Sequence, residues 1–285
     1  MTAASLPAIA ARVRHQAAAL PALYARFDFD RAPERWAAAP DDVTELGRVR
    51  GSNRAAWLED RELVARIREY TMLGDTVGDA YAALTRTLGF RRTVDMLVAA
   101  CDHGIAAVPD APGELAALIA AMEARPAWVD MALVAEGAAY ERNATANLSP
   151  FLIRGAFIAT FLNKYSALPM ALTGTLSHAT AARRVKETAT FFATTTLPGA
   201  LERHGPGFKA AAMVRLMHSM VRVNVLSQDG MWDAATYGVP IPQLDQMPAG
   251  LIPIYFLAQE VLGKGRKHFT REERGRVEIA RYRCF

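Results

Sequence analysis

The sequence predicts an all-α fold arranged as a single globular helical domain. Apolar residues recur at three- and four-residue spacings over several segments, which is the period of an amphipathic helix. Capping residues, prolines and glycines stand at the ends of these segments. No run of alternating apolar and polar residues is long enough to predict a sheet.

The expected helices follow in order along the chain. The periodic segments before residue 150 are Leu63–Met72, Thr93–Ile105, Leu115–Met122 and Val129–Tyr140. Pro126 and the pair Ser149-Pro150 are helix-start signals, and Thr270 with Glu273 forms a capping box for the last helix. Two further helical segments, 181–192 and 209–228, carry the polar residues considered below. Breaks are predicted at the Gly- and Pro-containing stretches 197–199, 204–207 and 238–242.

The domain organisation expected is an N-terminal arm followed by one helical domain. Residues 1–50 are rich in Ala, Pro and Arg and weakly periodic, which predicts an irregular arm with a peripheral helix. Residues 51–285 hold the regular helical patterns. The chain ends at Phe285 inside an amphipathic segment without a C-cap signal, as a C-terminally truncated domain would.

Composition and charge limit the classes of partner. The chain is 52% hydrophobic, enough for a sizeable core. Residues 261–285 carry eight Lys/Arg against three Glu, which is typical of a solvated terminal helix; attraction to an anionic membrane surface is the alternative. No nucleic-acid motif accompanies this charge. The longest apolar stretches, 155–163 and 251–263, fall short of a membrane span, and no secretory signal is present, so a cytoplasmic protein without integral membrane association is expected.

Several common catalytic patterns are absent from the sequence. There is no GxSxG, GxxxxGK[ST], HExxH or GxGxxG motif, and no two of the six histidines share a short metal-ligand spacing. Cys101 and Cys284 form neither a CxxC pair nor a CxxCH attachment site, so any haem would be bound non-covalently.

The segment 209–228, KAAAMVRLMHSMVRVNVLSQ, is apolar nearly all round, which predicts a helix buried at the centre of the molecule. Arg215, His218 and Arg222 lie on one stripe of this helix, at spacings of three and four. Buried guanidinium groups need anionic partners. A haem would supply two propionates for the arginines and an iron for the imidazole. A core histidine flanked by arginines in structural ion pairs is the alternative.

The segment 181–192, AARRVKETATFF, places Arg184 and Thr188 one helical turn apart on one face, with Glu187 beside them. If this helix covers the other side of a haem, Arg184 and Thr188 could donate hydrogen bonds to dioxygen and stabilise its developing negative charge. Glu187 could relay protons as a general acid or base. A solvated helix face, with Arg183 and Lys186 outward, is the alternative.

These motifs together resemble a known family. RRVKET, then VRLMHSMVR with His218 30 residues after Thr188, then WDAATYGVPIPQ at 232–243, are similar to the latex-clearing rubber oxygenases, a family that includes the MpaB-type ER-bound oxygenases. PAWVDMALVAEGAAYER at 126–142 and the stretch from Tyr165 to Leu172-Thr-Gly174 add to the resemblance, which covers roughly residues 70–285.

The resemblance implies an all-helical fold that encloses one haem b per chain. It places His218 at the proximal iron-ligand position, Arg184 and Thr188 in the distal pocket, and Arg215 and Arg222 beside the ligand. This chain has Glu187 where rubber oxygenases have a distal lysine, and Leu168 where they have a glutamate. The resemblance therefore supports the cofactor better than it supports rubber cleavage.

The function expected is a haem-dependent oxygenase that uses dioxygen to cleave a carbon–carbon double bond of an apolar or lipid-like substrate, or to hydroxylate it. The catalytic residues would be Arg184, Glu187 and Thr188. Candidates for an apolar pocket lining are Phe157, Phe161, Phe191, Phe192, Met213 and Met217. Two other interpretations stay open: a non-catalytic haem or gas-binding protein, and a cofactor-free helical scaffold whose arginines pair with buried carboxylates.

Overall fold

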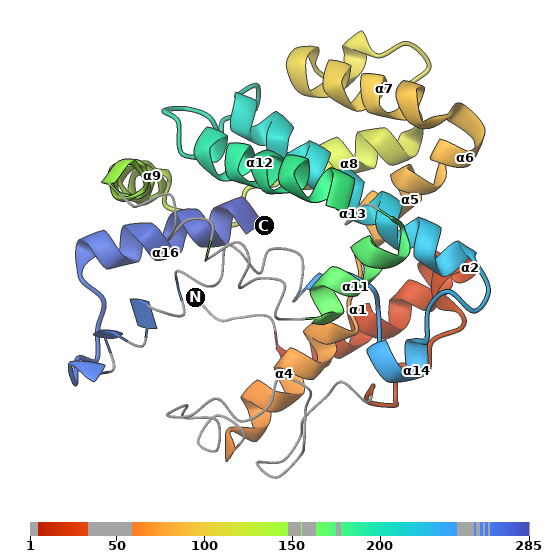
Figure 1. Ribbon diagram of the computed structural model, residues 1–285, viewed down its shortest axis with the longest axis horizontal. Helices are drawn as coiled ribbons and strands as arrows, with labels where there is room; N and C mark the ends of the chain where they lie inside the picture. Colours follow the sequence, from red (N-terminus) through yellow and green to blue (C-terminus); the bar gives the residue numbers. More distant parts are fainter. Residues whose placement is uncertain are drawn as a thin grey trace.

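The protein is helical wherever its computed structural model describes regular structure, which confirms the predicted all-α single domain (Figure 1). The structure describes residues 5–33, 59–147, 164–174, 178–243 and 263–284, together with residues 155, 254, 257, 258, 260 and 261. The elements are α1 Leu6–Ala19, α2 Pro21–Tyr24, α4 Arg61–Thr71, α5 Thr76–Ala83, α6 Thr85–Leu88, α7 Phe90–His103, the 3-10 turn η1 Ile105–Ala107, α8 Gly113–Glu123, α9 Met131–Asn147, α11 Lys164–Leu172, α12 His178–Thr195, α13 Pro206–Ser227, α14 Ala234–Tyr237 and α16 Arg271–Cys284.

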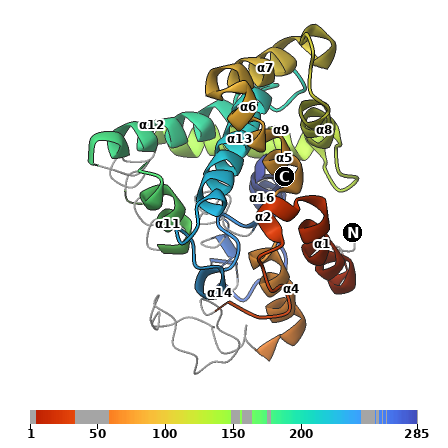
Figure 2. The same ribbon diagram turned by 90° about the vertical axis from the view of Figure 1, so that its right-hand side faces the viewer.

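Helix α13 is the centre of the main core. It packs against α5, α12, α7, α11 and α2, and both views show it passing between these helices (Figures 1 and 2). Ala212, Leu216 and Val225 on it are completely buried. The predicted central position of this apolar helix is therefore confirmed.

The helix ends follow the capping chemistry of the sequence. Helix α13 starts at Pro206 after Gly205, at the predicted break. The predicted capping box of α16 is present: the amide of Glu273 donates to Thr270 Oγ1 at 3.3 Å, and the amide of Thr270 donates to Glu273 Oε2 at 2.7 Å. Helix α9 starts slightly later than predicted, because Asp130 accepts from the amides of Ala132 and Leu133. The predicted start at Ser149-Pro150 lies outside the described residues.

The described part of the N-terminal arm joins the main core. Ile9 and Val13 of α1 and Tyr24 of α2 are buried, and Val13 and Tyr24 belong to the same hydrophobic cluster as α13. The helix expected to be peripheral thus contributes core side chains. Residues 34–58, the rest of the expected arm, lie outside the described residues.

Helices α9 and α16 form a second, smaller packing unit (Figure 1). Val134 and Ala138 of α9 pack with Ile279 of α16. Gly137 and Gly275 lie at the crossing point, where a Cβ on Gly137 would collide with the Gly275 backbone. The two helices therefore touch backbone to backbone, which only glycine allows.

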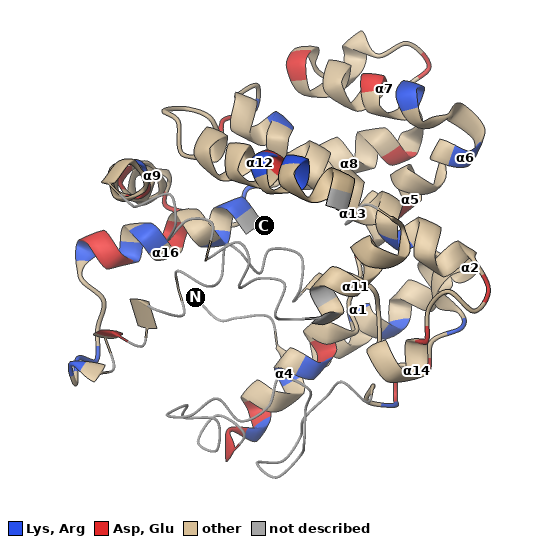
Figure 3. Cartoon of the chain, viewed as in Figure 1, with Lys and Arg blue, Asp and Glu red and all other residues tan. Residues whose placement is uncertain are grey.

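The basic C-terminal segment carries both signs of charge side by side (Figure 3). Arg271 pairs with Glu136 at 2.6 Å and Arg283 with Glu141 at 2.8 Å, so two of its cations hold α16 against α9. None of the described helices is both long and apolar enough to cross a bilayer.

Candidate functional site

His218 lies on α13 next to the helices that carry the other predicted site residues. Helices α12 and α11 both pack against α13. The His218 side chain is only partly exposed. Burial, followed by the charges of Arg222 and Arg184, lowers the pKa of His218 to about 4, while Asp75 opposes this shift. The imidazole is therefore neutral at physiological pH, which is the form that ligates a metal.

The two ring nitrogens of His218 have no protein partner among the described residues: no hydrogen bond or ion pair involves them. A largely buried imidazole normally finds such partners. His204, by contrast, has its Nδ1 2.9 Å from the carbonyl oxygen of Cys101. His218 thus has both nitrogens available to a ligand.

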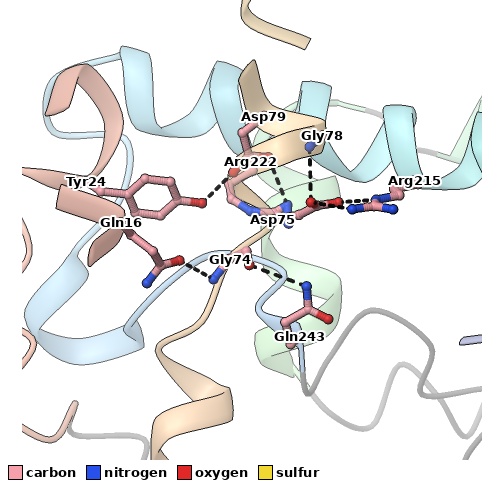
Figure 4. A network of polar contacts seen from close by, with 9 residues as sticks. All are labelled: Gln16, Tyr24, Gly74, Asp75, Gly78, Asp79, Arg215, Arg222 and Gln243. Atoms are coloured by element: carbon pink, nitrogen blue, oxygen red, sulfur yellow. Dashed lines mark hydrogen bonds and ion pairs between the residues drawn. The ribbon is translucent and has the colours of Figure 1, made fainter. Parts of the chain in front are cut away.

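Arg215 forms an ion pair with Asp75, the residue that caps α5 (Figure 4). Its Nε and Nη2 donate to the two carboxylate oxygens at 2.6 and 2.9 Å. The amide of Gly78 donates to the same carboxylate at 3.0 Å. Burial alone would raise the pKa of Asp75, but the Arg215 hydrogen bonds and the charges of Arg215 and Arg222 outweigh it and lower the pKa.

Arg222 faces Asp79, one turn further along α5 (Figure 4). Arg222 Nη1 lies 3.4 Å from Asp79 Oδ1, and neither side chain has any exposed surface. Tyr24 donates a hydrogen bond to the other carboxylate oxygen. Burial raises the pKa of Asp79 to about 6, although Arg222 acts to lower it.

The Arg222 site contains several buried polar atoms without hydrogen bonds. None of the three guanidinium nitrogens of Arg222 has a hydrogen-bond acceptor. Asp79 Oδ1 and Ser219 Oγ also have no hydrogen-bond partner. The contact between Arg222 and Asp79 is therefore electrostatic, with hydrogen-bonding capacity left over. Buried guanidinium nitrogens in this state are suited to a further acceptor such as a carboxylate.

The connection from α4 to α5 joins this network to residues of α1 and of the segment after α14. The amide of Gly74 donates to Gln16 Oε1 at 2.6 Å, and the side-chain amide of Gln243 donates to the Gly74 carbonyl at 3.4 Å (Figure 4). A Cβ on Gly78 would stand 2.6 Å from both Asp75 Oδ2 and Ser219 Oγ. Glycine is therefore required at position 78.

Helix α12 carries the predicted distal residues. Arg184 Nη1 lies 3.2 Å from Glu187 Oε2, and Arg184 Nη2 reaches Met170 Sδ of α11 at 3.8 Å. Thr188 Oγ1 donates to the Arg184 carbonyl at 3.0 Å. Glu187 is half exposed and also lies 3.4 Å from Arg183 Nε. Of these α12 residues, Arg184 contributes to lowering the pKa of His218 through its charge. The two helices are therefore coupled electrostatically.

The predicted apolar neighbours are only partly within the described residues. Phe191 is buried and stacks edge-on against Phe192. Met213 and Met217 are half-buried and pack against the main core, as does Leu168 of α11. Phe157 and Phe161 lie outside the described residues.

A cleft of about 470 Å³ opens on the Arg215 side of the network. It lies between α1 and the start of α5, and Arg12, His15, Asp75, Arg215 and Gln243 line it. Among the described residues, no group of three or more His, Cys, Asp and Glu side chains converges as a metal site would require.

Sequence analysis overlooked the acidic partners of the two arginines. Asp75 and Asp79 stand one helical turn apart in TMLGDTVGDAYAAL, an otherwise apolar stretch. Two carboxylates at this spacing, with two buried arginines elsewhere, are a signal for complementary buried pairs. Tyr24 carries no comparable signal in the sequence.

Comparison with known proteins gives one match. The family model described as ER-bound oxygenase mpaB/B'/Rubber oxygenase, catalytic domain, matches residues 142–277. No curated protein and no solved structure matches the chain. The matched range includes α11, α12 and α13, and hence His218 and the predicted residues of α12.

Proposed function

We propose that this protein is a haem-dependent oxygenase, because residues 142–277 match the family model of the mpaB and rubber oxygenase catalytic domain. Its substrates would be dioxygen and an apolar organic molecule. The observation that carries the cofactor proposal is His218, a neutral imidazole on the central helix whose two nitrogens have no partner among the described residues. A single imidazole is one of the proximal ligands by which proteins hold a haem iron.

The flanking arginines suit the acidic edge of such a cofactor. Arg215 uses Nε and Nη2 on Asp75, which leaves Nη1 for another acceptor. Arg222 holds three buried nitrogens without a hydrogen bond. We propose that these groups receive the propionates of haem b, one haem per chain, without covalent attachment.

Helix α12 would provide further polar groups of the haem pocket. When bound, the haem would supply the means to activate dioxygen. Arg184 and Thr188 would donate hydrogen bonds there and stabilise negative charge as it develops. Thr188 can do so by rotating its hydroxyl away from the Arg184 carbonyl that it now contacts. Glu187, held by Arg183 and Arg184, would exchange protons with solvent on its exposed side.

The substrate would lie among apolar side chains. Phe191, Met213 and Met217 are the described candidates, and dispersion with such groups favours an apolar molecule. The same surroundings would exclude water from the reacting atoms.

The test is an absorption spectrum of the purified protein, expressed with a haem precursor, before and after dithionite. We expect a Soret band that shifts on reduction, at one haem per chain. His218→Ala should lose this band or bind haem loosely. His103→Ala, which changes an exposed histidine of α7, is the matched control and should keep it. A protein that stays colourless after reconstitution with haemin contradicts the proposal.

Oxygen chemistry is tested separately from cofactor binding. Thr188→Ala and Arg184→Ala should retain the haem but weaken oxygen binding or turnover. If both variants match the parent in oxygen-binding kinetics, the distal roles are wrong. A protein that binds haem yet consumes no oxygen with any oxidisable apolar substrate would instead be the non-catalytic haem protein considered above.

A further inference from the structure

A second pocket lies away from His218, between α9 and the turn that follows α12. Its volume is about 230 Å³. Its apolar wall is formed by Val134, Ala135, Ala138, Leu197, Pro198 and Leu201. Val134 and Ala138 also belong to the small core of the α9–α16 unit, so the floor of this pocket is well packed.

One cation of the pocket has no carboxylate partner. Arg142 lines it, and among the described residues its only polar contact is a hydrogen bond from Nη1 to the Thr196 carbonyl. The acidic side chains nearest to it along α9 are engaged elsewhere: Glu136 with Arg271 and Glu141 with Arg283. A half-buried guanidinium group in this situation attracts an anionic group from outside the chain.

The single acidic residue of the pocket does not cancel this charge. Glu202 also lines it, but Arg125 Nη2 lies 3.7 Å from the Glu202 carboxylate. Arg125, Glu202 and Arg142 together leave one positive charge at the pocket. An apolar wall ending at a net cation suits a molecule with an alkyl chain and one carboxylate.

We infer that this pocket binds a short- to medium-chain alkyl carboxylate, with the carboxylate on Arg142 and the alkyl chain along α9. The volume is below the roughly 300–1,000 Å³ of sites for drug-sized ligands, which limits the length of the chain. The site requires neither haem nor His218. It therefore goes beyond the proposed function, and its test does not depend on whether the proposed function is correct.

Isothermal titration calorimetry with butanoate, hexanoate and octanoate tests the inference. Each methylene buried against the apolar wall contributes about 0.8 kcal/mol, so the Kd should fall roughly fourfold per methylene. Octan-1-ol, which has a chain of the same length but no charge, should bind more weakly than octanoate. Equal Kd values across the three acids would show that the chain is not buried and would overturn the inference.

Two variants locate the site. Arg142→Gln should weaken octanoate binding roughly tenfold to a hundredfold, because a hydrogen bond to a charged group is lost, while octan-1-ol binding stays unchanged. Ala135→Phe fills the pocket from an exposed position of α9 and should abolish binding of both ligands without disturbing the core. Arg92→Gln, which changes an exposed arginine of α7, is the matched control. Octanoate binding that survives both pocket variants refutes the site.

Discussion

The buried pair between Arg222 and Asp79 leads to a prediction in which the two single substitutions differ in their pH dependence. At 3.4 Å and an effective dielectric constant of about 20, the attraction between the two charges is about 5 kcal/mol. Removal of one partner of such a pair leaves an uncompensated buried charge and typically costs about 3–5 kcal/mol. For a chain of this size, that corresponds to a fall in Tm of roughly 6–20 °C.

The two single variants leave different residues behind. After Arg222→Met, Asp79 can become neutral by taking up a proton, since burial already raises its pKa to about 6 and loss of the arginine raises it further. The cost of Arg222→Met should therefore be small at pH 5 and rise towards pH 8. After Asp79→Asn, Arg222 stays charged at every accessible pH, so the stability of this variant should hardly depend on pH. Its cost relative to the parent should therefore fall from pH 5 to pH 8, because the parent itself loses stability as Asp79 ionises.

The assay is chemical unfolding followed by circular dichroism at 222 nm, at pH 5 and pH 8, with equal haem content in all samples. The double variant Asp79→Asn/Arg222→Met should be less destabilised than the sum of the two single variants, because neither charge is left alone. Arg91→Met, which removes an exposed pair with Asp95, should cost less than about 0.5 kcal/mol and serves as the control. Additive single costs, or a cost of Arg222→Met that is equal at both pH values, would refute the reasoning.

Three further predictions concern the same core. Gly78→Ala should destabilise the protein by about 1–3 kcal/mol in urea unfolding, because its Cβ would meet Asp75 and Ser219 at 2.6 Å; Gly113→Ala, whose Cβ meets nothing within 4 Å, should be neutral or slightly stabilising. Burial raises the pKa of Asp79 from 3.8 to about 6, so between these pH values Asp79 is protonated in the native state and ionised in the unfolded state. The free energy of unfolding should therefore fall by up to about 3 kcal/mol as the pH rises through this window. Asp79→Asn should remove this pH dependence from unfolding curves measured at pH 4 to 7. Burial also raises the pKa of the Cys101 thiol to about 11, so iodoacetamide should label Cys101 only after unfolding, as mass spectrometry of the digested protein can show; labelling of the native chain at that residue would contradict its burial.

Periodicity in the sequence was enough to predict the long helices but not the short ones. The segments 63–72, 93–105 and 209–228 each present an apolar stripe over several turns, and each forms a helix close to those bounds. Helix α5 has eight residues and contains Gly78, so its pattern is too short to be distinguished from a loop. Its importance comes from tertiary contacts: Asp75 meets Arg215 from a position 140 residues away in the chain.

The candidate site was predictable as a stripe on one helix but not as a network. Helical geometry alone placed Arg215, His218 and Arg222 on one side of α13. Helical geometry could not show whether these arginines are free to bind a cofactor or are already paired with carboxylates, because the pairing depends on where the start of α5 packs. The structure gives both arginines a carboxylate neighbour and still leaves Arg222 with hydrogen-bonding capacity.

The glycine contact between α9 and α16 has a consequence for how the chain folds during synthesis. Glu136 of α9 and Arg271 of α16 are 135 residues apart in sequence, yet they belong to one helix pair. At about 5–20 residues per second, the ribosome adds Arg271 roughly 7–27 s after it has added Glu136. Throughout that interval Val134 and Ala138 of α9 lack Ile279, their partner on α16. The nascent chain therefore displays an apolar helix face that a chaperone can bind until α16 has been synthesised and packs against it.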